Sequence, residues 1–251
     1  MTDKPFLTPT DKMTFFDRKI WDTFIKPGEV VEIRIPKAYG KSQAWNNEFA
    51  KGTVSGYFDD HNAFCRAVKA ADKMKHAGIY FTLQVIDRRL IGRAFNRLKP
   101  ADATTSDQNV IAYRWLPVDI DPVRPSGVSS SDRDLKAALN LREKVAKHVV
   151  TECGFSAPIR AVSGNGGHLL FRLPDMSVEK GKHFVYSTLV ALAKRFDTEG
   201  VTIDTTVFNP ARIWKLYGTT ARKGDAVPAG PKREARPHRM AYIDDMGVNN
   251  G

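Results

Sequence analysis

Two aspartates at the end of an apolar segment are the residues best suited to chemistry. Asp119 and Asp121 are separated by one apolar residue and follow the apolar residues 115–118. In a strand, alternate side chains point to the same face, so the two carboxylates would lie together, with alpha carbons roughly 6–7 Å apart. Adjacent negative charges repel unless a cation lies between them, and oxygen ligands suit Mg²⁺ or Mn²⁺. Taken alone, the pair is more often the solvated end of a strand.

A third aspartate closes a later apolar segment. Asp204 follows Ile203 at the end of residues 201–203, which alternate as a short strand does. Two-metal chemistry at phosphorus typically uses several carboxylates. An isolated aspartate at this position would be an ordinary turn residue, so Asp204 becomes a candidate ligand only alongside the first pair.

A glycine-rich turn separates these two segments. Residues 163–168 read Ser-Gly-Asn-Gly-Gly-His, and glycines let a backbone approach a ligand and direct N–H groups toward an anion. The turn lacks the Gly-Lys-Ser/Thr ending of a P-loop. An ordinary hairpin turn with a surface histidine remains the alternative. As phosphate contacts we consider Ser163, Gly164, Asn165, Gly166 and His168.

Positive charge is concentrated after Asp204. The chain carries a net charge of +11, and between Arg212 and Arg239 eight basic residues face two acidic ones, a net of +6. Such a surplus favours a polyanionic partner, although a solvated basic loop has the same composition. The candidates for holding a triphosphate are Asn209, Arg212 and Lys215, and those for nucleic-acid phosphates are Arg222, Lys223, Arg236 and Arg239.

The elements that position these residues follow from periodicity. In the first half we expect helices near 15–25, 61–76 and 90–98 and strands near 30–35, 53–58 and 79–83. In the second half the expected order is strand 115–120, helix 131–153, a hairpin of 158–163 and 168–173, helix 184–196 and strand 201–204. The prediction is an α/β (α+β) protein, with an RRM-like or ferredoxin-like core in residues 109–251 and an N-terminal α/β subdomain in residues 1–108.

Taken together, the motifs resemble the archaeo-eukaryotic primase superfamily. Its three motifs are a strand of the type hDhD, where h is apolar, a turn of the type SxxxxH, and a strand of the type hD. They occur here in order, at residues 118–121, 163–168 and 203–204. The chain is most similar to primase-polymerase domains of phages, plasmids and CRISPR-associated elements, over roughly residues 30–240. The chain departs from the family in two ways: its only cysteines, Cys65 and Cys153, cannot form the zinc module of many relatives, and this sequence does not include the helicase of the larger relatives.

The resemblance implies a two-part catalytic fold and a mechanism. Asp119, Asp121 and Asp204 would bind two Mg²⁺ or Mn²⁺ ions, and Ser163 and His168, with Arg212 and Lys215, would contact the phosphates of the incoming nucleotide. The first half would help to grip the template. The implied partners are a single-stranded DNA template, a primer strand, ribo- or deoxynucleoside triphosphates and a helicase, either as a partner or as a later part of a longer primase-helicase.

Three other functions remain open. An end-joining or repair polymerase of the same superfamily would extend annealed ends instead of starting primers. A two-metal nuclease would need clustered carboxylates but not a triphosphate-holding turn. An RRM-type binding module would present stacking aromatics on its sheet, where this chain has aspartates.

The sequence also bears on where in the cell the protein works. No apolar run approaches the roughly 20 residues that span a bilayer, and the first five residues do not begin a signal peptide. We therefore expect a cytoplasmic protein.

Overall fold

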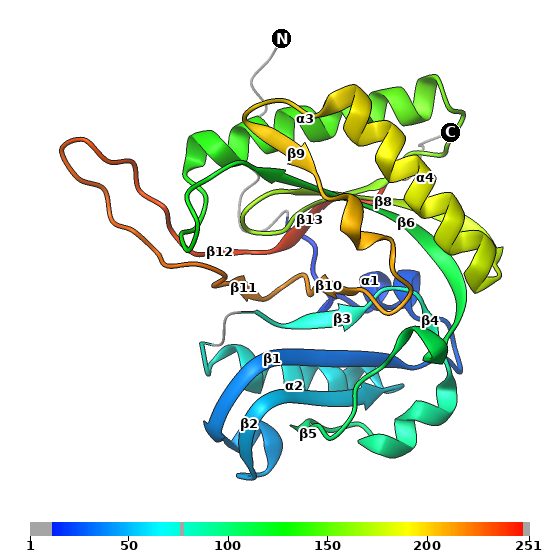
Figure 1. The fold of residues 1–251 in the computed structure, drawn as a ribbon. Helices are drawn as coiled ribbons and strands as arrows, with labels where there is room; N and C mark the ends of the chain where they lie inside the picture. Colours follow the sequence, from blue (N-terminus) through cyan, green and yellow to red (C-terminus); the bar gives the residue numbers. More distant parts are fainter. Residues whose placement is uncertain (1–11, 76–77, 248–251) are drawn as a thin grey trace.

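The computed structural model describes residues 12–75 and 78–247, which form two antiparallel sheets and the helices that cover them (Figure 1). The segments at 1–5 and 248–251 considered above, and His76 at the end of one expected helix, lie outside the described residues. None of the helices in the described ranges has the length and apolarity needed to cross a bilayer.

The first sheet has five strands, most of them from the N-terminal half. Its order is β10 (Ile213–Lys215), β3 (Tyr80–Thr82), β1 (Val31–Lys41), β2 (Phe49–Phe58) and β5 (Lys99–Pro100). Helix α2 (His61–Asp72) follows β2 and buries Phe64 and Val68 in the same apolar cluster as Val31, Ile33 and Ile35 of β1. One face of this sheet is therefore covered, and the other carries the polar residues of β1 and β2.

The second sheet has six strands, five of them on one path. Its order is β13 (Tyr242–Asp245), β7 (Ile159–Val162), β8 (Gly167–Met176), β6 (Val110–Pro122) and β4 (Val85–Ile86), with β9 (Val201–Ile203) also paired to β6. Helices α3 (Asp132–Thr151) and α4 (Val178–Phe196) lie together over this sheet, as Figure 1 shows. A separate two-stranded ribbon pairs β11 (Thr220–Ala221) with β12 (Arg239–Met240).

The expected α+β class is confirmed, and so is the element order of the second half. The chain runs β6–α3–β7–β8–α4–β9, and the four strands lie side by side in the order β9, β6, β8, β7. This is the split βαβ arrangement of ferredoxin-like sheets. Helix α3 begins with a capping box, in which Ser131 and Asp134 each accept the other's backbone N–H.

The helix expected over residues 90–98 is wrong. The segment forms a 3₁₀ helix at Arg88–Arg93 and then turns along the edge of β2, where the backbone of Asn96 donates to Tyr57. Asn96 has a φ of 48° and its side chain bonds to Asp59. These local hydrogen bonds compete with a helix, so the apolar spacing there reflects packing against a strand.

A short helix joins the two sheets. Helix α1 (Arg18–Phe24) places Phe24 against Phe81 of the first sheet, with ring centroids 5.7 Å apart, and against Trp115 of the second, at 5.1 Å. Because each aromatic pair contributes about 0.5–1.5 kcal/mol beyond its buried area, the contacts of Phe24 stabilise the junction between the two sheets.

Each sheet contains a strand from the other half of the chain, as divided at residue 108. Strand β10 completes the first sheet, whereas β4, from the first half, pairs with β6 of the second. The buried carboxylate of Glu32 on β1 also accepts the backbone N–H of Thr105. A boundary between subdomains at residue 108 stays a prediction, and any such subdomains share strands.

Candidate active site

The three aspartates line one cavity. Its volume is about 400 Å³, and its wall also contains residues of the glycine turn and of the first sheet. Asp119 and Asp121 come from the end of β6, Asp204 follows β9, and Tyr80 and Lys37 come from β3 and from the bulge of β1. The cavity thus lies where the two sheets meet.

The strand register explains the position of the first pair. Asp119 lies opposite His168 of β8 and Asp121 lies opposite Thr202 of β9, while Ile120 between them is fully buried. Both carboxylates therefore occupy the same face of the sheet. The negative charge of Asp119, followed by burial, raises the pKa of Asp121 to about 6. One oxygen of Asp119, Oδ1, is buried and has no hydrogen-bond partner.

Asp204 reaches the same cavity, but its carboxylate is engaged locally. Its backbone N–H donates to the carbonyl oxygen of Asp119 at 2.9 Å, which fixes the end of β9 beside β6. Its Oδ1 accepts the backbone N–H and the hydroxyl of Thr206, each at 2.7 Å, and so caps a 3₁₀ helix at Thr205–Phe208. In residues 12–75 and 78–247, no three His, Cys, Asp or Glu side chains are placed to share one ion.

His168 is held by two aromatic residues. Tyr217 accepts the indole N–H of Trp214 at 2.8 Å, and its hydroxyl lies 2.9 Å from Nδ1 of His168. When the hydroxyl of Tyr217 donates to Nδ1, the imidazole has its proton on Nε2. That nitrogen lies 3.3 Å from Oδ1 of Asp119 and makes a close contact there without hydrogen-bond geometry.

The glycine turn is closed by its own side chains. The hydroxyl of Ser163 accepts the backbone N–H of Gly166 at 2.8 Å, and the amide oxygen of Asn165 accepts the N–H of Ser130. A Cβ at Gly166 would lie 2.3 Å from the carbonyl oxygen of Ile120 and 2.9 Å from Oδ1 of Asp121. Glycine is therefore required at 166 for the turn to approach the aspartate strand. Gly164 has a φ of +103°, a conformation that residues with a side chain rarely adopt.

Arg212 and Lys215 line the cavity, and Asn209 does not. The terminal nitrogen of Arg212 donates to Thr206, while its Nε is buried without a hydrogen-bond partner. The ammonium of Lys215 donates to the hydroxyl of Thr219 at 2.7 Å and to the carbonyl oxygen of Thr220 at 3.1 Å. Burial lowers the pKa of Lys215 to about 7.

The basic residues further along are placed differently from one another. Lys223 lines the cavity, but Arg222 pairs with Asp72 of α2 at 2.9 Å. Arg236 and Arg239 pair with Asp134 and Asp132, at 2.8 and 2.6 Å, in the first turn of α3. These two arginines anchor the arm of residues 222–238 that projects from the molecule in Figure 1.

Two basic residues and a tyrosine of this wall were not expected from the sequence. Arg124 lies with its guanidinium 3.7 Å from Asp121, and Lys37 and Tyr80 approach from the first sheet. Arg124 could have been found, because it follows the aspartate motif by three residues and the loop after a strand often returns to its end. Lys37 and Tyr80 depend on how the two sheets meet, for which the sequence has no local signal.

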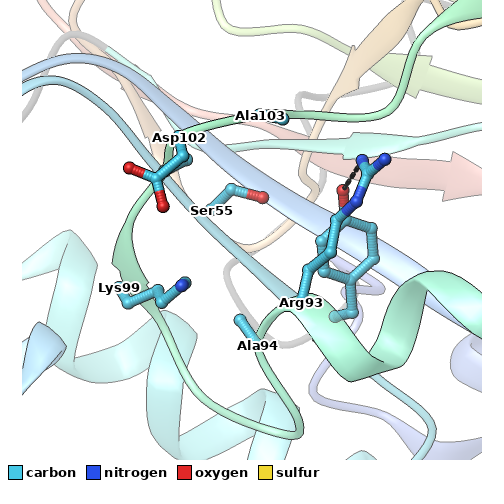
Figure 2. A pocket seen from close by; sticks show the side chains of 8 residues that line it. Ser55, Arg93, Ala94, Lys99, Asp102 and Ala103 are labelled. Carbon is cyan, nitrogen blue, oxygen red and sulfur yellow. Dashed lines mark hydrogen bonds between the residues drawn. The ribbon is translucent and has the colours of Figure 1, made fainter.

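A smaller cavity of about 140 Å³ lies between β2 of the first sheet and the segment of residues 93–103 (Figure 2). Ser55, Arg93, Lys99 and Asp102 line it, and the guanidinium of Arg93 donates to the hydroxyl of Tyr57 at 3.3 Å. It shares no lining residue with the aspartate cavity.

The donor set of the aspartate cavity suits a divalent cation at the first pair. The unpartnered oxygen of Asp119 beside a second carboxylate is an arrangement that a hard cation stabilises. Asp204 would have to turn its carboxylate away from Thr206 to become a third ligand. The described residues thus fit a metal at Asp119 and Asp121 directly, and at Asp204 after a side-chain rotation.

The comparisons with known proteins add little to this geometry. No family model matches the chain, and no curated protein matches it. Among solved structures, the chain is similar to the polymerase domain from Mycobacterium tuberculosis ligase D in complex with DNA, at 14% identity and a TM-score of 0.44, over 95% of this chain and 88% of that one. At this TM-score the shared arrangement does not assign a fold family.

Proposed function

We propose that this chain transfers nucleotides from nucleoside triphosphates to a nucleic-acid strand, with divalent cations held at Asp119 and Asp121. One observation carries the proposal. The cavity wall contains two residues with a buried polar atom that has no hydrogen-bond partner among the described residues: the acceptor Oδ1 of Asp119 and the donor Nε of Arg212. A buried polar group left unsatisfied costs about 1–3 kcal/mol, so both groups favour a ligand that satisfies them. A triphosphate with its bound cation provides a positive ion for the first and anionic oxygens for the second.

Divalent cations held by Asp119 and Asp121 would supply the electrostatic part of this reaction. A divalent ion at two carboxylates lowers the pKa of an attacking hydroxyl and neutralises charge on the phosphates. Mg²⁺ and Mn²⁺ both suit oxygen ligands, and the proposed number of ions is two.

The chain's own residues would bind and orient the nucleotide. Arg212, Arg124 and Lys223 surround the carboxylate pair with positive charge, as a triphosphate requires. His168, protonated on Nε2, would donate to a phosphate oxygen or hold Asp119 in place. Ser163 and Asn165 would act by shaping the turn, since their side chains already bond within it and to Ser130.

Among nucleotidyl transferases, we propose a primase-polymerase that copies single-stranded DNA. The proposal of primer initiation, and of a setting in a mobile element or a CRISPR-associated pathway, follows from the motif order at residues 118–121, 163–168 and 203–204. Extension of annealed ends in repair is the nearest rival within the class.

The test is synthesis on a single-stranded DNA template, with and without an annealed primer, from labelled ribo- or deoxynucleotides with Mg²⁺ or Mn²⁺. Products without a primer indicate a primase, and products only with a primer indicate an extending polymerase. Shortening of a labelled template would indicate a nuclease instead.

A matched pair of variants makes the result specific. Asp119→Asn should abolish synthesis and keep the fold, whereas Asp22→Asn on the exposed surface of α1 should leave synthesis unchanged. Synthesis by Asp119→Asn at the wild-type rate would contradict the proposal.

A further inference from the structure

The ends of β1 and β2 carry a group of four side chains that neither the core nor the candidate active site uses. The strand register pairs Tyr39 with Lys51 and Lys41 with Phe49. Directly paired residues share a face of a sheet, and residues two apart on one strand share it too. The four residues therefore form one patch in which two rings and two ammonium groups alternate; we call Tyr39, Lys41, Phe49 and Lys51 the hairpin patch.

The rings of the hairpin patch are exposed. Tyr39 is 72% exposed and Phe49 is 54% exposed, and their centroids lie 5.4 Å apart in an edge-to-face contact. On the opposite face of the same hairpin, Ala38 and Ala50 are buried in the core. Folding thus gains its buried area from the other face, and these two rings remain in water next to each other.

Positive charge surrounds the rings. Lys41 and Lys51 are exposed, and so is Lys37, four residues before Lys41. Within the part of the chain that the structure describes, none of these three ammonium groups has an ion-pair partner, and the nearby Glu48 lies 3.8 Å from Arg97. Free cations beside exposed rings suit a ligand with both anionic groups and flat apolar surfaces.

The hairpin patch and Tyr80 in the wall of the aspartate cavity lie on the same face of the sheet, and Ser55 between them is buried. Ala50 and Val54 of β2 both lie in the core, so Lys51 and Ser55 lie on the opposite face. Ser55 pairs with Arg34, which pairs with Tyr80 in the cavity wall. The bulge between Ile35 and Ala38 brings Tyr39 back to this face after Arg34 and leaves Lys37 in the cavity wall.

We propose that the hairpin patch binds single-stranded DNA, with bases stacked on Tyr39 and Phe49 and phosphates paired with Lys41 and Lys51. Every base has an apolar face, so two rings can hold successive bases without reading their sequence. The lysines supply the charge that a phosphate chain requires. That this strand is the template leading to the aspartates rests on the proposed function, whereas binding itself does not.

The experiment measures binding of fluorescein-labelled oligothymidylate by anisotropy, with a chelator present so that no synthesis occurs. Tyr39→Leu and Phe49→Leu should each weaken binding about fivefold or more, because an aliphatic side chain cannot stack. Tyr39→Phe should bind like the wild type. An oligonucleotide of the same length without bases should bind weakly to all of these proteins and should not distinguish them.

The lysines have a separate readout. Lys41→Gln with Lys51→Gln should reduce the slope of log affinity against log salt by about 1.4, since each phosphate contact of a single strand contributes roughly 0.7. The matched control for the two ring variants is Tyr186→Leu, which removes a 47% exposed ring from α4, outside this face of the first sheet, and should leave binding unchanged. All substituted positions of the patch are exposed, so melting temperatures should stay at the wild-type value.

The outcomes separate this proposal from the proposed function. Wild-type affinity of Tyr39→Leu and Phe49→Leu, or equal losses on the base-free strand, would overturn the role of the rings. If those variants lose affinity and the wild-type protein makes no product, the hairpin patch stands and nucleotidyl transfer falls. If product forms and the variants bind normally, the reverse holds.

Discussion

Asp121 shows how the fold holds two like charges together. The charge of Asp119 and partial burial raise the pKa of Asp121 to about 6, so the ionised pair is unfavourable without a cation. We expect Asp121→Asn to melt at a higher temperature than the wild type at pH 8 in the presence of a chelator, because the variant removes this repulsion. The same variant should lose nucleotide transfer. Scanning calorimetry with and without Mg²⁺ measures the first effect, and a lower melting temperature than wild type in chelator would refute it.

Arg212 tests the anion side of the same cavity. Its buried Nε lacks a partner, and lysine has no equivalent of the planar guanidinium fork. We predict that Arg212→Lys raises KM for the triphosphate about tenfold while the melting temperature changes little. Arg222→Lys is the contrast, because Arg222 pairs with Asp72 and should affect stability more than KM. Equal effects of the two substitutions on KM would argue against a phosphate at Arg212.

At the scale of elements, the contact between the glycine turn and β6 decides the shape of the site. Gly166 leaves no space for a Cβ, which would meet the backbone of Ile120 at 2.3 Å. Gly166→Ala must push the turn from β6, and overpacking of this kind costs roughly 1–3 kcal/mol. A fall in urea midpoint together with reduced synthesis is expected. Gly200→Ala, where nothing lies within 4 Å, is the matched control, and a similar loss there would refute the steric explanation.

Ion pairs between distant segments act at the scale of the whole molecule. Arg114 on β6 donates to Glu29 before β1 and to Asp175 on β8, and its guanidinium holds the pKa of Asp175 well below its usual range. A depressed carboxyl pKa contributes stability above the unfolded-state value, and this contribution is lost as pH falls. We therefore predict that the wild type loses stability below about pH 4.

The matching variant isolates that contribution. Arg114→Met should destabilise the protein at pH 7 and flatten the acid limb of the stability curve, because the pKa of Asp175 then lies closer to its unfolded value, with Arg172 as the remaining guanidinium partner. Denaturant titrations at several pH values give both quantities. An acid limb of unchanged steepness in the variant would assign the pH dependence to other carboxylates.

Ligand linkage is the second prediction at this scale. A ligand that binds only the folded protein stabilises it by about 2.7 kcal/mol at a hundred times its dissociation constant. We expect Mg²⁺ together with a triphosphate to raise the melting temperature more than the sum of their separate effects. The cation would reduce the repulsion between the triphosphate and the two aspartates, so each ligand would strengthen the binding of the other. Asp119→Asn should abolish this excess. Strictly additive effects in the wild type would count against a shared site.

The sequence by itself determined much of the second half. Alternation and capping residues predicted β6, α3, the β7–β8 hairpin, α4 and β9 in order, because these are local properties of the chain. The spacing of Asp119 and Asp121 also placed them on one face, because strand geometry alone sets that relation.

Only the tertiary structure decided what each candidate side chain contacts. Arg236 and Arg239 carry the same charge as Arg212, yet they pair with aspartates in the first turn of α3 while Arg212 lines the cavity, and no local pattern distinguishes them. Likewise the approach of Lys37 and Tyr80 to the aspartates depends on packing between two sheets far apart in sequence. Hydrogen-bond partners and burial arise from such long-range packing, which is why residue type and spacing predicted the elements and the aspartate pair but not the full wall of the site.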